Sequence, residues 1–164
     1  MNQLDPATAL LLNPIGVIHT PFNEPTGTPI QSGFAGRAAG RVEVFEPYVA
    51  GLTDLEGFER IWLLYWFHRA REPRLKVVPY RDTVERGVFA TRAPCRPCPL
   101  GLSAVRLIEV SGNILHIEGA DMLDGTPLLD IKPYVPRFDC VPSSAAGWLD
   151  RTPVDREQAD DRFA

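Results

Sequence analysis

The sequence predicts a mainly β protein: a closed or nearly closed β-barrel made of a single sheet of short strands, with little helix. Sixteen prolines and thirteen glycines are spread along the 164 residues, so turns must interrupt the chain often. About seven or eight short segments have strand patterns, and some follow one another as hairpins do. Closing the sheet would remove the exposed edges that so many short strands would otherwise leave.

The expected strands are short apolar or alternating segments bounded by proline, glycine or polar turns. They are residues 15–19, 37–45, 61–67, 76–78, 87–91, 104–110, 114–118 and 128–132. In the second segment, Val42 and Val44 should point to the face opposite Arg41, Glu43 and Phe45, because side chains alternate along a strand.

The third segment, IWLLYWF, is the most apolar run in the chain. Because it is short and aromatic, we expect a buried central strand, with a buried helix as the alternative. Residues 53–56 are expected to form a single capped helical turn. Residues 104–110 and 114–118 flank the turn Ser111-Gly112-Asn113 and should pair as a hairpin.

The length predicts one domain, with the barrel over residues 1–149 and a charged tail, expected to be mobile, over residues 150–164. Three cysteines, an odd number, argue against a secreted disulfide framework. The first residues lack a basic region and include Asp5, which is unusual for a signal peptide. No apolar run is long enough to cross a membrane. We therefore expect a cytoplasmic protein that does not contact membranes.

The charge is unevenly distributed. The formal net charge is −4, but the stretch from Arg60 to Arg106 contains ten basic and only three acidic side chains. Such a basic region could bind phosphates. The alternative is a set of solvated strand edges on which basic side chains prevent unwanted pairing.

The stretch after residue 91 is a stiff, proline-rich loop. Pro94, Pro97 and Pro99 each fix the backbone and restrict the preceding residue. The loop carries Arg92, Arg96, Cys95 and Cys98. Either it presents functional side chains, or it is only a proline-rich connector at the surface. The CxxC spacing fits a metal or redox site, but the second cysteine pair of a zinc site is absent, and we expect no metal. Phosphate-binding loops, nucleophile elbows and dinucleotide-binding fingerprints are also absent.

Two motifs together resemble the signature of the TsaA-like, or TrmO-like, tRNA methyltransferases: GVFATRAPCRPCPLGLS from Gly87 and GADMLDGTPLLDIKPYVPRFD from Gly119. The resemblance extends from Ile15 to Leu149. It implies a β-barrel homodimer that uses S-adenosylmethionine (SAM) to methylate N6 of N6-threonylcarbamoyladenosine beside the anticodon of tRNA. The chain resembles the short members, which lack a C-terminal domain.

The resemblance also implies residue roles. The implied cofactor-binding residues are Gln31, Ser32, Gly33, His68, Arg69, Arg92, Leu102, Met122, Leu123, Asp124 and Gly125. The expected substrate-binding residues are Arg96, Cys98 and Lys132, and the candidates for a catalytic base are His68, Asp121 and Tyr134.

The chain departs from the family at Cys98, where the loop usually reads RPNP, and a thiol cannot replace the paired donor and acceptor of an amide. Two other functions therefore stay open: methylation of a different acceptor, and a non-catalytic sensor that binds SAM or a metal.

Overall fold

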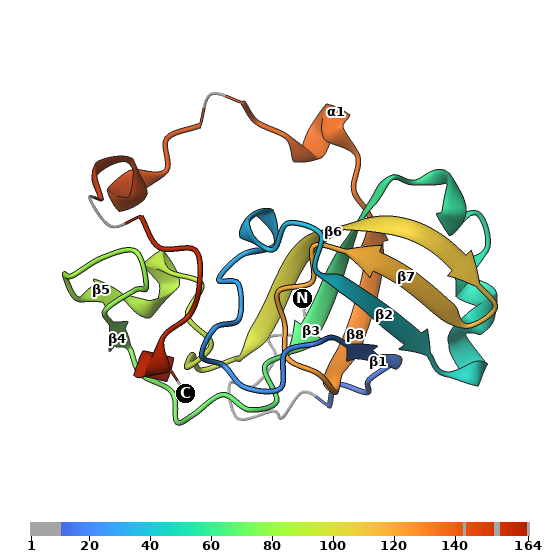
Figure 1. Ribbon diagram of the computed structural model, residues 1–164, viewed down its shortest axis with the longest axis horizontal. Coiled ribbons are helices and arrows are strands. Elements are labelled where there is room, and N and C mark those ends of the chain that lie inside the picture. The colour runs from blue at the N-terminus through green and yellow to red at the C-terminus, as the bar shows by residue number, and fades with distance from the viewer. Residues whose placement is uncertain (1–10, 143, 153–154, 164) are drawn as a thin grey trace, which may run out of the picture.

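The computed structural model describes residues 11–142, 144–152 and 155–163. Six antiparallel strands close into a barrel in the order β1-β2-β7-β6-β3-β8, with β8 pairing back to β1 (Figure 1). The barrel strands are β1 (Gly16–His19), β2 (Ala39–Val44), β3 (Arg60–Trp66), β6 (Leu100–Ser111), β7 (Ile114–Glu118) and β8 (Thr126–Pro133). The predicted closed barrel is confirmed.

The remaining elements are short. A separate two-stranded sheet is formed by β4 (Lys76–Val77) and β5 (Arg86–Gly87). The only α-helix in the described ranges is α1 (Pro136–Asp139). The 3-10 helices are η1 (Ser32–Phe34), η2 (Glu46–Leu52), η3 (Leu55–Gly57), η4 (Val88–Ala90), η5 (Gly147–Arg151) and η6 (Asp161–Phe163). Within the part of the chain described, every helix is too short to cross a lipid bilayer.

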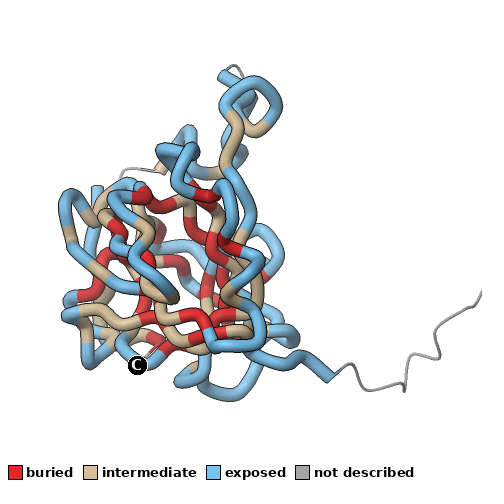
Figure 2. Tube along the Cα trace, turned by 90° about the vertical axis from the view of Figure 1, so that its right-hand side faces the viewer, coloured by how far each residue is buried: buried red, intermediate tan, exposed pale blue. Residues whose placement is uncertain are grey.

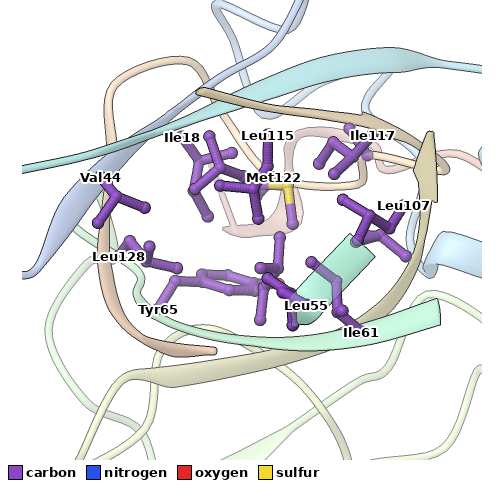
Figure 3. Close-up of a cluster of buried hydrophobic side chains, with 14 of the residues drawn as sticks. Ile18, Val44, Leu55, Ile61, Tyr65, Leu107, Leu115, Ile117, Met122 and Leu128 are labelled. Carbon is purple, nitrogen blue, oxygen red and sulfur yellow. The ribbon is translucent and has the colours of Figure 1, made fainter. Parts of the chain in front are cut away.

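Strand β3 is the buried central strand that the apolar run predicts, so the helical alternative is wrong. It lies between β6 and β8, and Ile61, Leu63 and Tyr65 point into the barrel. Val42 and Val44 are buried on β2, as the alternation predicts. Figure 2 shows which parts of the chain are buried, and apolar side chains from all six strands fill the barrel (Figure 3). The interior is therefore a packed core, and a ligand site must lie at an end of the barrel.

Two sequence predictions are wrong near the proline-rich loop. Only Gly87 of the expected strand 87–91 is in a strand, because the next residues turn into η4. Val88 is buried there, and the backbone N–H and hydroxyl of Thr91 both donate to its carbonyl. In contrast, Leu100 already belongs to β6, opposite Trp66 of β3. The loop is therefore shorter than its composition suggests.

The helical turn expected at residues 53–56 forms at Leu55–Gly57, as η3, and no side chain caps it. Asp54 precedes it with φ 66, a left-handed conformation that an aspartate tolerates better than most residues.

The described tail residues 155–163 pack against the body of the protein, in contrast to the expected mobile tail. Ala159 exchanges backbone hydrogen bonds with Gly27 and Thr28 at 2.9 and 2.8 Å. Phe163 is buried, with its ring 4.9 Å from that of Tyr80 in an edge-to-face contact. Backbone hydrogen bonds and one buried aromatic ring therefore hold this charged segment against the body.

Candidate functional site

A cavity of about 390 Å³ lies where β3 ends and β6 begins. Its other walls come from residues 25–31, from the proline-rich loop, from residues 121–126 between β7 and β8, and from Ala159 and Phe163 of the tail. The residues expected at the site that line this cavity are Gln31, His68, Arg69, Arg92, Arg96, Leu102, Asp121, Met122 and Leu123. The two family-like motifs therefore meet in one cavity.

Four further cofactor candidates stand beside the cavity without lining it. Ser32 donates its hydroxyl to the Ala104 carbonyl at 2.9 Å, and Gly33 follows it in η1. Asp124 accepts a hydrogen bond from the backbone N–H of Thr20 at 3.1 Å, and Gly125 has φ 74, which favours glycine. In this structure these residues shape the loops that carry the lining residues.

Three candidates lie away from the cavity. Cys98 is exposed, and Lys132 forms an ion pair with Asp130 at 2.7 Å. The ring of Tyr134 packs on Trp62 with centroids 5.4 Å apart, and its backbone N–H binds the Arg60 carbonyl at the beginning of β3. A strand rises about 3.3 Å per residue, so Tyr134 is roughly 17 Å from the cavity end of β3. The structure therefore brings His68 and Asp121 together but leaves Tyr134 apart.

Arg92 and Arg96 provide unpaired positive charge in the cavity. Arg92 bonds to the side-chain oxygen of Gln31, and Arg96 lies 3.4 Å from the Thr91 carbonyl. Among the described residues, neither guanidinium has a carboxylate within 4.0 Å, whereas Arg69 pairs with Glu24 at 2.9 Å. A guanidinium without a partner is well suited to bind a carboxylate or phosphate of a ligand.

A chain of hydrogen bonds connects the barrel interior to the cavity. The Ser103 hydroxyl donates to Asp121 Oδ1 at 2.7 Å, and Tyr65 Oη lies 3.0 Å from Ser103 Oγ. Because the only hydroxyl hydrogen of Ser103 is used on Asp121, the Tyr65 hydroxyl must donate to Ser103. Burial raises the pKa of Tyr65, which keeps this hydroxyl protonated as a donor. The chain therefore fixes the position of the Asp121 carboxylate.

Asp121 itself has unusual acidity. Burial raises the pKa of this carboxyl to about 6, although the Ser103 hydroxyl, the Ser32 backbone N–H and the Arg92 charge oppose the shift. The group is mainly ionised at neutral pH, but it can take up a proton far more readily than an ordinary aspartate. This is the property expected of a general base.

The close packing of Tyr65 depends on Gly101, which lies opposite it on β6. A Cβ atom at position 101 would lie 2.1 Å from Cε2 of Tyr65. The ring therefore occupies the space of a missing side chain, and the Tyr65 hydroxyl reaches Ser103 from there. The sequence analysis did not identify Tyr65 or Ser103 as functional residues. The signal for Tyr65 was available, since it is the one polar side chain on the inward face of an apolar strand.

His68 is oriented by the loop after β7. Its Nδ1 lies 3.4 Å from Thr126 Oγ1, which donates its hydrogen to the Leu123 carbonyl at 2.7 Å. A neutral His68 can therefore donate Nδ1–H to Thr126 and keep Nε2 as an acceptor. Partial desolvation and the Arg69 charge lower the pKa of His68, so the ring is neutral at pH 7.

The CxxC cysteines have different environments. Cys95 is buried in a second apolar cluster with Val77, Val88, Ala93 and Phe163, while Cys98 and Cys140 are exposed. Among the residues described, no group of three or more histidine, cysteine, aspartate or glutamate side chains is placed to hold a metal ion. Packing is enough to explain Cys95.

The sequence matches the family model described as the tRNA-methyltransferase O N-terminal domain over residues 17–140. A probable S-adenosyl-L-methionine-binding protein of Pyrococcus abyssi is 53% identical over 148 residues, which cover 90% of this chain and 80% of that protein. The tRNA (adenine(37)-N6)-methyltransferase of Escherichia coli is 36% identical over 150 residues, covering 85% of this chain and 64% of that enzyme.

Solved structures agree with the sequence comparison. A crystal structure of TrmO is similar with a TM-score of 0.74 and 42% identity, over 85% of this chain and 64% of that one. The structure of TrmO from Pseudomonas aeruginosa is similar with a TM-score of 0.72 and 39% identity, over 85% and 62% of the two chains. The similarity thus spans somewhat less than two thirds of these structures.

Proposed function

The chain belongs to the tRNA-methyltransferase O N-terminal domain family, and from this membership and its cavity we propose that it is a SAM-dependent methyltransferase. The proposed reaction is methylation of N6 of N6-threonylcarbamoyladenosine beside the anticodon of tRNA. The single observation that carries the proposal is the meeting of unpaired Arg92 and a positioned carboxylate, Asp121, in one cavity formed by both family motifs. Relatives named as SAM-binding proteins and as a tRNA adenine-N6 methyltransferase support it.

The cavity fits SAM in size and chemistry. Its volume of about 390 Å³ is within the usual range for small-molecule sites. Ile30, Leu102 and Met122 offer apolar surface for an adenine ring, and Arg92 offers a guanidinium for the carboxylate. When bound, SAM supplies a methyl group activated by its sulfonium charge. The role of the protein is mainly to hold the two reactants in line.

Asp121 is the proposed proton acceptor. The acceptor nitrogen must lose a proton when it gains a methyl group, and Asp121 is ionised above its pKa of about 6. The hydrogen bonds from Tyr65 through Ser103 hold the carboxylate in place before it acts. His68, which is neutral at pH 7, is the second proposed acceptor. Tyr134 is not part of the proposal, because it lies at the other end of β3.

The proposed acceptor is RNA. Arg69, Arg92 and Arg96 line the cavity, and the latter two have no carboxylate partner among the described residues, which suits binding of phosphates near the reacting base. A second candidate function is SAM binding without transfer, because the Pyrococcus abyssi relative is named only as a probable binding protein.

We also propose that the protein is a homodimer. Phe138, in α1, and Val141, in the segment between α1 and η5, are 70% and 66% exposed. This segment runs apart from the barrel strands (Figure 1). Large apolar side chains exposed in this way are typical of an interface. Light scattering on the purified protein measures its mass directly, and Phe138→Ser should shift the mass to that of a monomer.

Nucleoside analysis tests the proposed reaction. The protein is incubated with isotopically labelled SAM and tRNA that carries N6-threonylcarbamoyladenosine, and the digested nucleosides are weighed by mass spectrometry. We expect one labelled methyl group on that nucleoside. Arg92→Ala should abolish the product, whereas Arg106→Ala, an exposed arginine outside the cavity, should retain it. Tight SAM binding by the unaltered protein without a methylated nucleoside would instead support the second candidate function.

A further inference from the structure

A second cavity, of about 580 Å³, adjoins the first. We propose that it binds the base of the acceptor nucleoside by stacking on aromatic side chains, an inference that rests on the proposed function. The cavity lies between η1, the 3-10 helix η4 and η5, and its volume is in the usual range for a small organic ligand. None of the residues expected from the sequence, apart from Gln31 and Arg92, belongs to it.

Five of the fourteen residues that line this cavity are aromatic. They are Phe34, Tyr80, Phe89, Trp148 and Phe163. Phe89 is 76% exposed. A flat aromatic surface open to solvent beside a cavity is what a nucleobase requires, since stacking of a base on an aromatic ring contributes about 1–3 kcal/mol.

Trp148 is held in a fixed orientation at this cavity. Its Nε1 donates to the Ala90 carbonyl at 2.7 Å, and the Arg86 guanidinium lies 5.6 Å from the ring centroid. Ala90 directly follows Phe89, so this hydrogen bond ties η5 to the segment that carries Phe89. The two rings are therefore presented by segments that are connected to each other, which preorganises the stacking surface.

Charge at the cavity matches a nucleotide. Arg81 lies 5.1 Å from the Phe34 ring centroid, and its Nη2 pairs with Asp155 at 2.9 Å. Its Nε is buried and has no hydrogen-bond partner in the part of the chain that the structure describes. Arg92 adds a guanidinium without a carboxylate partner among the described residues. The positive charge of these two arginines would favour a phosphate or carboxylate attached to the stacked nucleoside.

The position of the second cavity favours an acceptor over an unrelated ligand. Gln31, Thr91 and Arg92 line both cavities, as do Ile30, Tyr80 and Phe163. A base in the second cavity would therefore lie next to a cofactor in the first, so that its N6 could extend past the shared residues toward Asp121, which lines only the first cavity. The Gln31 amide lies among these shared residues. Its oxygen accepts from Arg92 and its nitrogen donates to the Ile30 carbonyl, which leaves one amide hydrogen and one oxygen lone pair for the edge of a base.

Phe89→Ala tests the inference, because an exposed side chain can be removed with little effect on folding. The probe is an anticodon stem-loop RNA that contains N6-threonylcarbamoyladenosine, and its binding and methylation are measured together with SAM affinity. Losing one stacking contact should weaken RNA binding about 5–150-fold and leave SAM affinity unchanged. Phe89→Tyr should bind RNA as the unaltered protein does. Leu75→Ala, which removes a side chain that is 70% exposed and outside both cavities, is the matched control.

The outcomes separate this inference from the proposed function. If Phe89→Ala binds and methylates the RNA as well as Leu75→Ala does, the second cavity is not the acceptor site. If the unaltered protein binds the RNA in a way that depends on Phe89 but transfers no methyl group, the base site stands and the proposed reaction is wrong. If Phe89→Ala lowers SAM affinity to the same extent as RNA affinity, the two cavities form one site and the assignment is overturned.

Discussion

Replacing Gly101 with alanine would place a methyl group that overlaps with the ring of Tyr65. The new Cβ would lie 2.1, 2.4 and 2.7 Å from three ring carbons, whereas carbon atoms in contact are about 3.5–4.0 Å apart. The ring has little room to retreat, because Tyr65 is 3% exposed and makes an edge-to-face contact with Phe67 at 5.3 Å. The ring or the β3–β6 pairing must therefore shift.

The expected cost follows from these contacts. Overpacking of a core costs about 1–3 kcal/mol, and the lost Tyr65–Ser103 hydrogen bond adds about 1 kcal/mol. Alanine returns about 0.4–1 kcal/mol by restricting the unfolded chain. We expect Gly101→Ala to lower the free energy of unfolding by about 1–3.5 kcal/mol, or the melting temperature by about 2–14 °C for a chain of this size.

Urea denaturation measures this difference, with Gly51→Ala as the control. A Cβ at Gly51 meets no atom within 4 Å, so that variant should be as stable as the unaltered protein or slightly more stable. In a Tyr65→Ala background the penalty of Gly101→Ala should largely disappear, because the two residues are in direct contact. Equal stability of the Gly101 and Gly51 variants would refute the packing argument.

Three further predictions concern the cavity. Arg92→Ala should weaken SAM binding about 10–150-fold in calorimetry, because a charged hydrogen bond is lost, and should leave the melting temperature unchanged. Unchanged affinity would show that the anionic end of the cofactor binds elsewhere. The folded pKa of Asp121, about 6, exceeds its ordinary value of 3.8, so the stability it contributes is present below pH 4 and is lost as pH rises through 6, by about 3 kcal/mol. Asp121→Asn should lack this fall in urea titrations at pH 4 and 7, and identical pH dependence in both proteins would contradict the raised pKa. Phe163→Ala should lower the free energy of unfolding by about 1.5–3 kcal/mol and weaken SAM binding, because this side chain is buried and lines both cavities; full affinity would show that the tail is not needed there.

The barrel was predictable because its information is local. Val42 and Val44 alternate with polar residues, and the run from Ile61 is too short and aromatic for most helices, so strand patterns identified all six barrel strands. The segment after Gly87 failed because Val88 is buried against residues distant in sequence, and this turns the backbone into a 3-10 helix. No local pattern reports such a contact.

The candidate site was found mainly through family resemblance, which selected nine of the 25 residues that line the first cavity. It did not find Ser103, whose role depends on pairing β6 with β3 so that its hydroxyl meets Tyr65 and Asp121. It also gave no indication that Phe163 lines the cavity. A single phenylalanine in a charged tail has no local pattern that predicts burial, and its contact with Tyr80 is known only from the structure.

Because Cys95 is buried, the rate at which its thiol is modified reports how often the structure around it opens. A thiol reagent should modify the exposed Cys98 and Cys140 within seconds to minutes, while Cys95 reacts only when the cluster around Phe163 separates. The two fast thiols serve as an internal standard in the same sample. Where the slow rate exceeds the rate of global unfolding, it measures how often the segment carrying Arg92 and Arg96 detaches while the barrel stays folded.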